Sequence, residues 1–293
     1  MFSKGVRYML LSTLFFALMN VCVKLVPHIP AMEVILFRSA ISLVISYVAL
    51  RRQQVSVWGN NRGLLIMRGL TGSTALVLFF NTLQNLPLAT AATIQYLSPI
   101  FTTILGVFLV KEKVKPWQWV FFAISFAGII VIEGLDATAN SLYVWMGVGS
   151  ALFSGLAYSS IRRLNTREHP LVIVFYFPLV ALPIAGIYSA FNWVQPEGWD
   201  WAILLLVGLF TQLGQYYMTM SYQAEEISKV ANLNYIGIIY ALALGFILFD
   251  EHFELATYVG MGLVLVGVVL NVRYKNKLTK REARDREAAL PKV

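Results

Sequence analysis

The feature that most constrains this chain is a succession of apolar blocks, each about twenty residues long. An α-helix rises 1.5 Å per residue, so ~20 residues cross the ~30 Å hydrocarbon core of a bilayer. Of the 293 residues, 58% are hydrophobic and 13% are charged, whereas soluble domains are roughly half apolar and a quarter charged. The pattern therefore predicts an all-α integral membrane protein.

The breaks between the blocks, rich in Pro, Gly or charge, divide the chain into ten expected transmembrane helices. Their ranges are 4–26, 31–51, 63–85, 88–110, 116–134, 142–163, 170–191, 200–222, 227–249 and 255–273. The first block is too long for a signal peptide and lacks a small-residue cleavage site, so we expect it to be a span. The single cysteine, Cys22, excludes an internal disulfide and a cysteine-based zinc site.

Lys and Arg occur in alternate connections only. They precede the first span, follow the second, fourth, sixth and eighth, and fill the tail from Arg273. The other connections, around 27–30, 86–87, 133–140, 192–200 and 250–254, carry none. Since cytoplasmic loops retain positive charge, we predict a multi-pass protein of the cell membrane with both termini cytoplasmic. The net charge of +8 is then accounted for without nucleic-acid binding.

The chain resembles itself at a spacing of 139 residues. The segment "LATAATIQYLSPIFTTILGVFLVKE" (88–112) aligns with "ISKVANLNYIGIIYALALGFILFDE" (227–251), which matches Gly106 with Gly245 and Glu112 with Glu251. Each half then holds five spans, and because five is odd the second half is inverted in the membrane. Inverted repeats with a site between them are an architecture of secondary transporters.

The strings "VILFRSAISL", "MRGLTGSTALVLFFNTLQNLPLATAATIQYLSPIFTTILGVFLVKEKVKPWQWVFFAISFAGIIVI", "GVGSALFSGLAYSSIRRL" and "FDEHFELATYVGMGLVLVGVVL" resemble the EamA-domain branch of the drug/metabolite transporter superfamily. The resemblance implies one repeat over 1–137, a second over 138–273, and a basic cytoplasmic tail over 274–293. It also implies export or exchange of small organic metabolites. One departure is Ile238, where such families often have a proline equivalent to Pro99.

The sequence contains no HExxH, GxSxG or P-loop motif of the kinds that mark enzymes. The three histidines, His28, His169 and His252, fall at expected helix ends and are too scattered for a metal site. We therefore expect no catalytic residue, no metal and no cofactor, which makes a membrane enzyme a weak alternative.

Ionisable residues at membrane depth are costly and usually face a cavity or a partner. Arg38 lies about 10 Å from the outer end of its expected helix, and Arg68 about 9 Å from the inner end of the next. Each arginine either clamps a neighbouring helix or meets a negative charge on a substrate. Glu33 is a poor partner for Arg38, because five residues on a helix place side chains roughly 140° apart. We expect Glu33 at the outer mouth near Lys24.

Polar and aromatic side chains inside the spans supply the other candidates for a substrate site. The full candidate set is Asn20, Lys24, Arg38, Asn81, Gln84, Gln95, Tyr158, Gln212, Gln215, Tyr216, Asn232 and Tyr235. The alternative for any one of them is hydrogen bonding between helices. Helices are expected to bend at Pro99, Gly237, Pro178 and Pro183, and Pro99 leaves the carbonyl of Gln95 without its helical donor.

These observations predict a secondary transporter that works by alternating access on small organic metabolites. With basic residues in surplus and no acid near mid-membrane, anionic or zwitterionic, amino-acid-like solutes are favoured. The alternative, a multidrug exporter of lipophilic cations, would be expected to keep a buried carboxylate. Internal duplication removes the need for a dimer, so we expect a monomer whose partners are the bilayer and its substrate.

Overall fold

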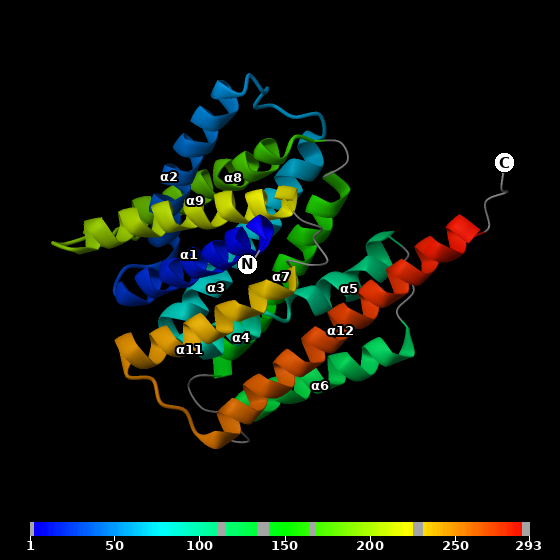
Figure 1. Ribbon diagram of the computed structural model, residues 1–293. Coiled ribbons are helices and arrows are strands. Elements are labelled where there is room, and N and C mark those ends of the chain that lie inside the picture. Colours follow the sequence, from blue (N-terminus) through cyan, green and yellow to red (C-terminus); the bar gives the residue numbers. More distant parts are fainter. Residues whose placement is uncertain (1–2, 111–114, 134–140, 165–167, 225–230, 289–293) are drawn as a thin grey trace.

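Figure 1 shows a computed structural model of the chain, which describes residues 3–110, 115–133, 141–164, 168–224 and 231–288. These residues form helices and no strands. In the first half the helices are α1 (Lys4–Leu25), α2 (Ala31–Arg52), α3 (Arg62–Asn85), α4 (Leu88–Gln95), α5 (Ser98–Val110) and α6 (Pro116–Glu133). In the second half they are α7 (Ser141–Leu164), α8 (Pro170–Phe191), α9 (Asp200–Ala224), η1 (Ala231–Tyr235), α11 (Ile236–Phe249) and α12 (Leu255–Ala288).

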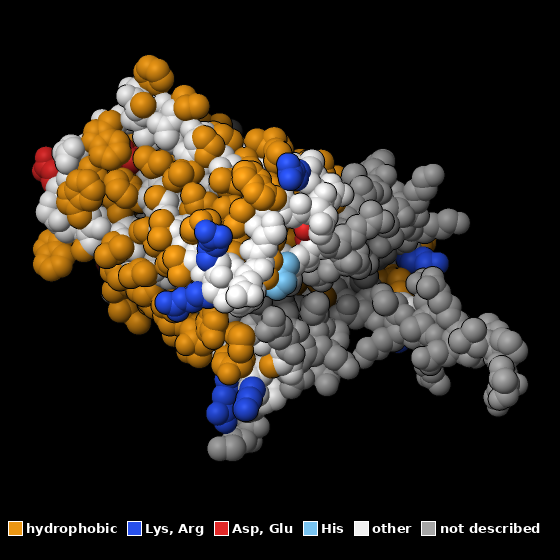
Figure 2. Space-filling view, turned by 90° about the horizontal axis from the view of Figure 1, so that it is seen from above, with side chains coloured by type: hydrophobic (Ala, Val, Ile, Leu, Met, Phe, Trp, Pro, Cys, Tyr) orange, Lys and Arg blue, Asp and Glu red, His pale blue; other side chains and the backbone are white. Residues whose placement is uncertain are grey.

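Seven stretches in the described residues are long and apolar enough to cross a membrane. They are 4–25, 31–52, 62–85, 88–105, 171–191, 200–218 and 255–274, and shorter apolar helices cover 116–132 and 233–249. Hydrophobic side chains also cover most of the described surface in Figure 2, and Lys and Arg appear in a few separate places. Such a surface is suited to lipid rather than water. The chain is a multi-span membrane protein.

Two of the expected spans are interrupted. The range 88–110 is divided into α4 and α5 at Tyr96 and Leu97, just before Pro99, where each backbone N–H bonds the carbonyl oxygen three residues back instead of four. Proline has no N–H to donate and its ring clashes with the preceding turn. The range 227–249 is a 3₁₀ turn, η1, followed by α11, and residues 227–230 lie outside the described part. Pro99 and Gly237, where bends were expected, each lie just after one of these two interruptions.

Two further helices bear on the expectations from the sequence. Pro178 and Pro183, where bends were expected, both lie inside α8, which continues through them. The range from 274, expected as a basic cytoplasmic tail, continues α12 as helix as far as Ala288.

The helices form pairs between the two halves. α1 packs on α9, α3 on α7 and α8, α2 on α8 and α9, and α6 on α12. In Figure 1 the pair α6–α12 lies along the lower side, with α4 and α11 between it and α1. Glycines allow these approaches: a side chain at Gly128 of α6 would overlap the carbonyl oxygen of Gly260 on α12. Small residues at helix interfaces are how membrane helices gain close packing.

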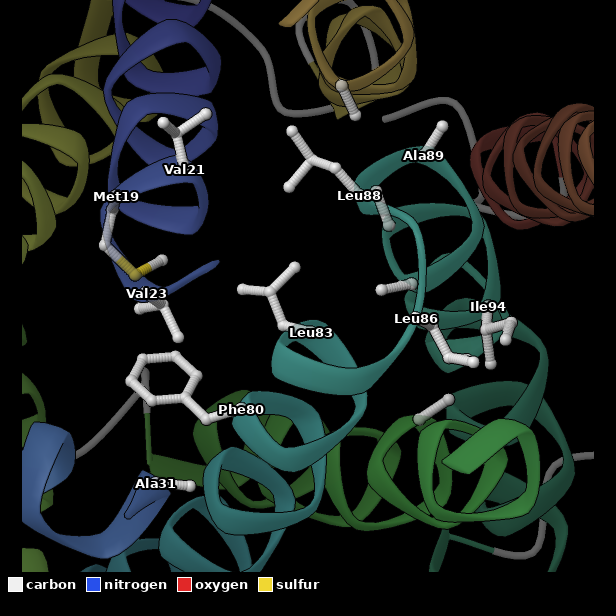
Figure 3. Packing of buried hydrophobic residues seen from close by; sticks show 14 of the residues in the cluster. Met19, Val21, Val23, Ala31, Phe80, Leu83, Leu86, Leu88, Ala89 and Ile94 are labelled. Atoms are coloured by element: carbon white, nitrogen blue, oxygen red, sulfur yellow. The ribbon is translucent and has the colours of Figure 1, made fainter. Parts of the chain in front are cut away.

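The main hydrophobic core lies where α1, α3 and α4 meet. Figure 3 shows Val23 of α1, Phe80 and Leu83 of α3, and Leu88 of α4 pointing toward the same space. Each of these side chains is fully buried. The core therefore fixes the position of α4, whose far end is the break at Tyr96.

Candidate functional site

Two arginine side chains from the first half converge on one aromatic ring of the second half. The Cζ atom of Arg38 on α2 lies 5.0 Å from the ring centre of Phe177 on α8. The Cζ atom of Arg68 on α3 lies 4.8 Å from the same centre. Arg38 also donates from Nε to the hydroxyl oxygen of Thr211 on α9, at 3.0 Å. We call Arg38, Arg68, Phe177 and Thr211 the two-arginine site.

The arginines of this site have no acidic partner among the residues that the structure describes. No Asp or Glu of these ranges forms an ion pair with either guanidinium. Arg38 is only 7% exposed, and Nε and Nη1 of Arg68 are buried without an acceptor in the described chain. Contact with an aromatic face offsets part of the cost of burying a cation. Most of that cost remains, because a buried charge usually needs a hydrogen-bonded counter-charge.

Two glycines on α3 allow the ring of Phe177 to approach Arg68. A side chain at Gly69 would overlap Val180, and one at Gly72 would overlap the ring of Phe177. The added carbon at Gly72 would also lie 3.5 Å from Nη1 of Arg68. Because both positions lack a side chain, α8 packs closely on α3 and Phe177 reaches the guanidinium.

A group of tyrosines joins this site to the broken helices. Tyr158 of α7 lies within electrostatic range of both Arg68 and Tyr96. Tyr96, at the break between α4 and α5, donates its hydroxyl to the carbonyl oxygen of Asn234 in η1 at 2.5 Å. Its ring centre lies 5.3 Å from that of Tyr235. The two irregular segments therefore meet, and a side chain at Gly237 would overlap the Tyr96 hydroxyl. Gly237, expected to give flexibility, here permits that close approach.

A second charged group has all its members paired. Nζ of Lys24 lies 3.0 Å from Oε1 of Glu251 and donates to the carbonyl oxygen of Leu86 at 2.6 Å. Both carboxylate oxygens of Glu251 accept from the backbone N–H of Leu88, at 2.8 and 2.9 Å. Leu88 begins α4, so Glu251 places negative charge at the positive end of that helix. We call Lys24, Leu86, Leu88 and Glu251 the Lys24–Glu251 cluster.

The turn after α11 directs Glu251 to that position. Asp250 has a left-handed backbone (φ 51°) that ends α11, and the N–H of Glu251 donates to the carbonyl oxygen of Gly245 at 3.1 Å. A side chain at Gly245 would overlap the Glu251 carboxylate. Glycine at 245 thus allows the carboxylate to fold back toward α4.

Two buried glutamates join loops of opposite halves. Oε2 of Glu33, at the start of α2, accepts from the N–H of Val194 in the connection between α8 and α9, at 3.0 Å. Oε1 of Glu168, just before α8, accepts from the N–H groups of Asn60 and Asn61 in the connection between α2 and α3. We expected Glu33 near Lys24, but Lys24 is paired with Glu251 instead. Glu33 also forms no pair with Arg38, as the five-residue spacing indicated.

The structure places the other candidate residues in separate environments. Gln84 donates to the carbonyl oxygens of Val26 and Ile29, at 3.1 and 3.0 Å. Gln95 donates to Ser154 and accepts from Ser150, both on α7 and both at 2.9 Å. These two amides serve contacts between segments of the chain.

The last candidates are less closely tied to either charged group. Asn81 donates to Val77 of its own helix, and Oδ1 of Asn20 is buried without a donor in the described chain. Gln212 and Gln215 are half-buried, and Tyr216 is exposed with its ring against Tyr217. The side chain of Asn232 lies outside the described residues.

Sequence reasoning missed two residues that complete these groups, Phe177 and Thr211, and one contact, the link from Glu251 to Lys24. Phe177 precedes Pro178 in an apolar span, and nothing in its spacing indicates an arginine partner. The alignment of Glu251 with Glu112 singled it out, but not its contact with the first half. No cluster of three metal-ligating His, Cys, Asp or Glu side chains occurs in the described ranges.

Comparison with known proteins agrees with this architecture. The EamA-like transporter family matches residues 3–134 and 141–273. The pseudopaline exporter CntI of Pseudomonas aeruginosa is 29% identical over 92% of this chain and 96% of its own. Human solute carrier family 35 member G1 is 27% identical over 92% of this chain and 78% of its own. An S-adenosylmethionine uptake transporter of Rickettsia felis is 23% identical over 74% of this chain and 71% of its own.

A crystal structure of a protein shares the fold, with a TM-score of 0.66 at 16% identity, over 91% of this chain and 96% of that one. The family match covers nearly all of the described residues, and the relatives bear the names of transporters. Small-molecule transport, rather than enzyme catalysis, is the activity these findings support. The chain belongs to the EamA-like transporter family.

Proposed function

We propose that this chain is a secondary transporter, an exporter or exchanger, of small anionic or zwitterionic organic solutes. The observation that carries the proposal is the two-arginine site, where two guanidinium groups lie against one ring without an acidic partner in the described chain. Guanidinium groups bind carboxylate and phosphate with paired hydrogen bonds. A lipophilic cation would instead meet two positive charges here.

The proposed mechanism is alternating access between two inverted five-helix repeats, 1–137 and 138–273, across ten spans. The helix pairs support it. Each helix has a counterpart five spans away in the chain: α1 corresponds to α7, α2 to α8 and α3 to α9. When every helix is exchanged for its counterpart, the pair α1–α9 becomes α7–α3 and the pair α2–α9 becomes α8–α3. All four of these pairs are packed in the structure. The pairs α2–α8 and α6–α12 convert into themselves.

The two buried glutamates follow the same exchange. Glu33 begins α2 and bonds the connection after α8, whereas Glu168 precedes α8 and bonds the connection after α2. Such a reciprocal relation is expected when two halves are related by a two-fold axis in the membrane plane. The alternating basic loops then place both termini in the cytoplasm.

The residues that form the two-arginine site support such a mechanism. Arg38 and Arg68 belong to the first half, and Phe177 and Thr211 to the second. A solute bound to all four would touch both halves, so its contacts would change when the halves move against each other. The chain is expected to do this as a monomer.

The test is transport by purified protein in proteoliposomes, with a panel of amino acids, carboxylates, nucleosides and organic cations. We expect counterflow of one or more acidic or zwitterionic solutes above empty liposomes, and loss of most of it in Arg38→Gln and Arg68→Gln. Arg62→Gln is the matched control, since Arg62 lies at the exposed start of α3 against Trp58. Transport of cations alone, unaffected by either substitution, would contradict the proposal.

A further inference from the structure

The two guanidinium groups of the two-arginine site are close enough to act on one ligand. Both Cζ distances are measured to the centre of the same Phe177 ring, 5.0 and 4.8 Å, so the two carbons are separated by no more than their sum. Like charges at such a separation repel each other strongly in a medium of low dielectric constant. A ligand that neutralises only one of them leaves the other uncompensated.

The donors also exceed what one protein acceptor satisfies. Arginine carries five N–H donors, and Arg38 donates to the hydroxyl of Thr211, which is neutral. Nε and Nη1 of Arg68 point to different sides of the guanidinium, and both are buried without an acceptor in the described chain. Carboxylates form strong, charge-assisted hydrogen bonds with such guanidinium donors.

The buried carboxylates of the described chain are engaged elsewhere. Glu33 bonds Val194, Glu168 bonds Asn60 and Asn61, and Glu251 bonds Lys24 and Leu88. Their bonds run to the connections between helices and to the start of α4, not to the arginines. Within the described ranges no carboxylate balances Arg38 and Arg68, which leaves the site open to the negative charge of a ligand.

We propose that the two-arginine site binds a small organic dicarboxylate, with one carboxylate on Arg38 and Thr211 and the other on Arg68. Phe177 offers apolar surface next to both cations, which suits the hydrocarbon chain that joins two carboxylates. Tyr158 of α7 lies within electrostatic range of Arg68, the arginine that would hold the second carboxylate. This inference rests on the proposed function and names the substrate class of that site.

The experiment compares diacids with matched monoacids on the full-length protein in nanodiscs. The probes are malonate, succinate, glutarate and adipate, each with the monoamide that removes one charge, and binding is followed by thermal shift and by calorimetry. We expect one chain length to bind best, and its monoamide to bind at least tenfold more weakly. Arg38→Gln and Arg68→Gln should each bring the diacid-to-monoamide ratio close to one, whereas Arg62→Gln should leave it unchanged.

Charge-retaining variants keep the test decisive if a glutamine variant does not fold. Arg38→Lys and Arg68→Lys should preserve a preference for diacids with weaker binding, because Lys cannot make the bidentate contact. Equal binding of diacids and monoamides by the wild type would overturn the inference, as would a preference that survives both glutamine variants. Stronger binding of phosphate monoesters than of any diacid would overturn it as well.

The two proposals fail in different ways. If the protein transports other solutes in proteoliposomes but does not prefer diacids, the substrate class is wrong and the transport function stands. If no solute of any class crosses above empty liposomes, the proposed function itself is contradicted, whatever the calorimetry reports.

Discussion

The Lys24–Glu251 cluster and the two-arginine site treat buried charge in opposite ways. In the cluster, Lys24 and Glu251 neutralise each other and bond the backbone at both ends of the α3–α4 connection. In the two-arginine site, two positive charges lie against one ring with no counter-charge in the described chain. Both regions join the first half of the chain to the second.

This difference indicates different roles: the Lys24–Glu251 cluster holds the two halves together, whereas the two-arginine site is suited to binding a ligand. A paired cluster gains stability from its bonds, and losing one member leaves the other charged and buried. An unpaired cation gains nothing until an anion arrives, so evolution would retain it for binding rather than stability. The two regions should therefore respond to substitution with opposite signs.

The largest effect is expected from Glu251→Ala. The change removes the partner of Lys24 and the negative charge at the start of α4, and both side chains are largely buried, at 15% and 8% exposed. Breaking a buried pair by removing one partner costs about 3–5 kcal/mol, and partial exposure places this case at the lower end. Thermal unfolding in detergent should show a large fall in midpoint, and Glu254→Ala, at an exposed position, should show little. Equal unfolding midpoints for the two variants would contradict a stabilising role of the Lys24–Glu251 cluster.

Gly245→Ala should act on the same cluster without removing any charge. The added carbon would overlap the Glu251 carboxylate, so the carboxylate must shift away from Leu88 and Lys24. We expect a loss of about 1–3 kcal/mol, typical of an overpacked site. Gly262→Ala is the matched control on α12, because nothing lies within 4 Å of a side chain there, and it should be neutral or slightly stabilising. Similar losses in both variants would show that helix backbone effects, rather than the carboxylate, decide the result.

Arg68→Met should have the opposite sign. The substitution removes a charge whose Nε and Nη1 are buried without an acceptor in the described chain, and it relieves repulsion with Arg38. Replacing buried ionic groups by apolar ones of similar size is often neutral or stabilising, so we expect the free energy of unfolding to stay level or rise by up to about 2 kcal/mol. Thermal unfolding without ligand measures stability, and anion binding should be lost in the same preparation. A clear destabilisation would mean that Arg68 clamps helices.

The sequence predicted the class of fold but not the two breaks in full. Apolar length indicated membrane helices, because the bilayer sets a length that composition reveals directly. Pro99 indicated the interruption after Gln95, since its missing N–H acts locally. The 3₁₀ turn at Ala231–Tyr235 has no proline, and its position next to Tyr96 depends on packing between segments far apart in the chain.

The candidate site was predictable in its charges but not in its partners. Arg38 and Arg68 are conspicuous because charge is rare in a span. Phe177 is one of many aromatic residues in apolar helices, and its contact with both arginines follows from Gly69 and Gly72 admitting α8. Lys24 and Glu251 are 227 positions apart, so only the folded chain joins them. The sequence shows which residues are charged, but only the folded structure shows which partner each charged residue contacts.

The smallest effect should come from the two glutamates that join opposite loops, compared through Glu33→Gln and Glu168→Gln. Glutamine keeps an oxygen that accepts an N–H, so the backbone donors of the loops stay paired, but its NH2 group adds two new donors. Glu168 accepts from two N–H groups next to the start of α3, where a negative charge is favoured by the helix dipole. Loss of the Glu168 charge should cost about 1 kcal/mol.

Glu33 is fully buried, accepts from one N–H, and its Oε1 has no donor in the described chain. Removing its charge lowers the cost of burial, and this gain offsets the cost of the new buried amide donors, so stability should change by less than about 0.5 kcal/mol. Thermal unfolding of the two variants side by side measures the difference, and a larger loss for Glu33→Gln would mean that its carboxylate has a charged partner in the protein.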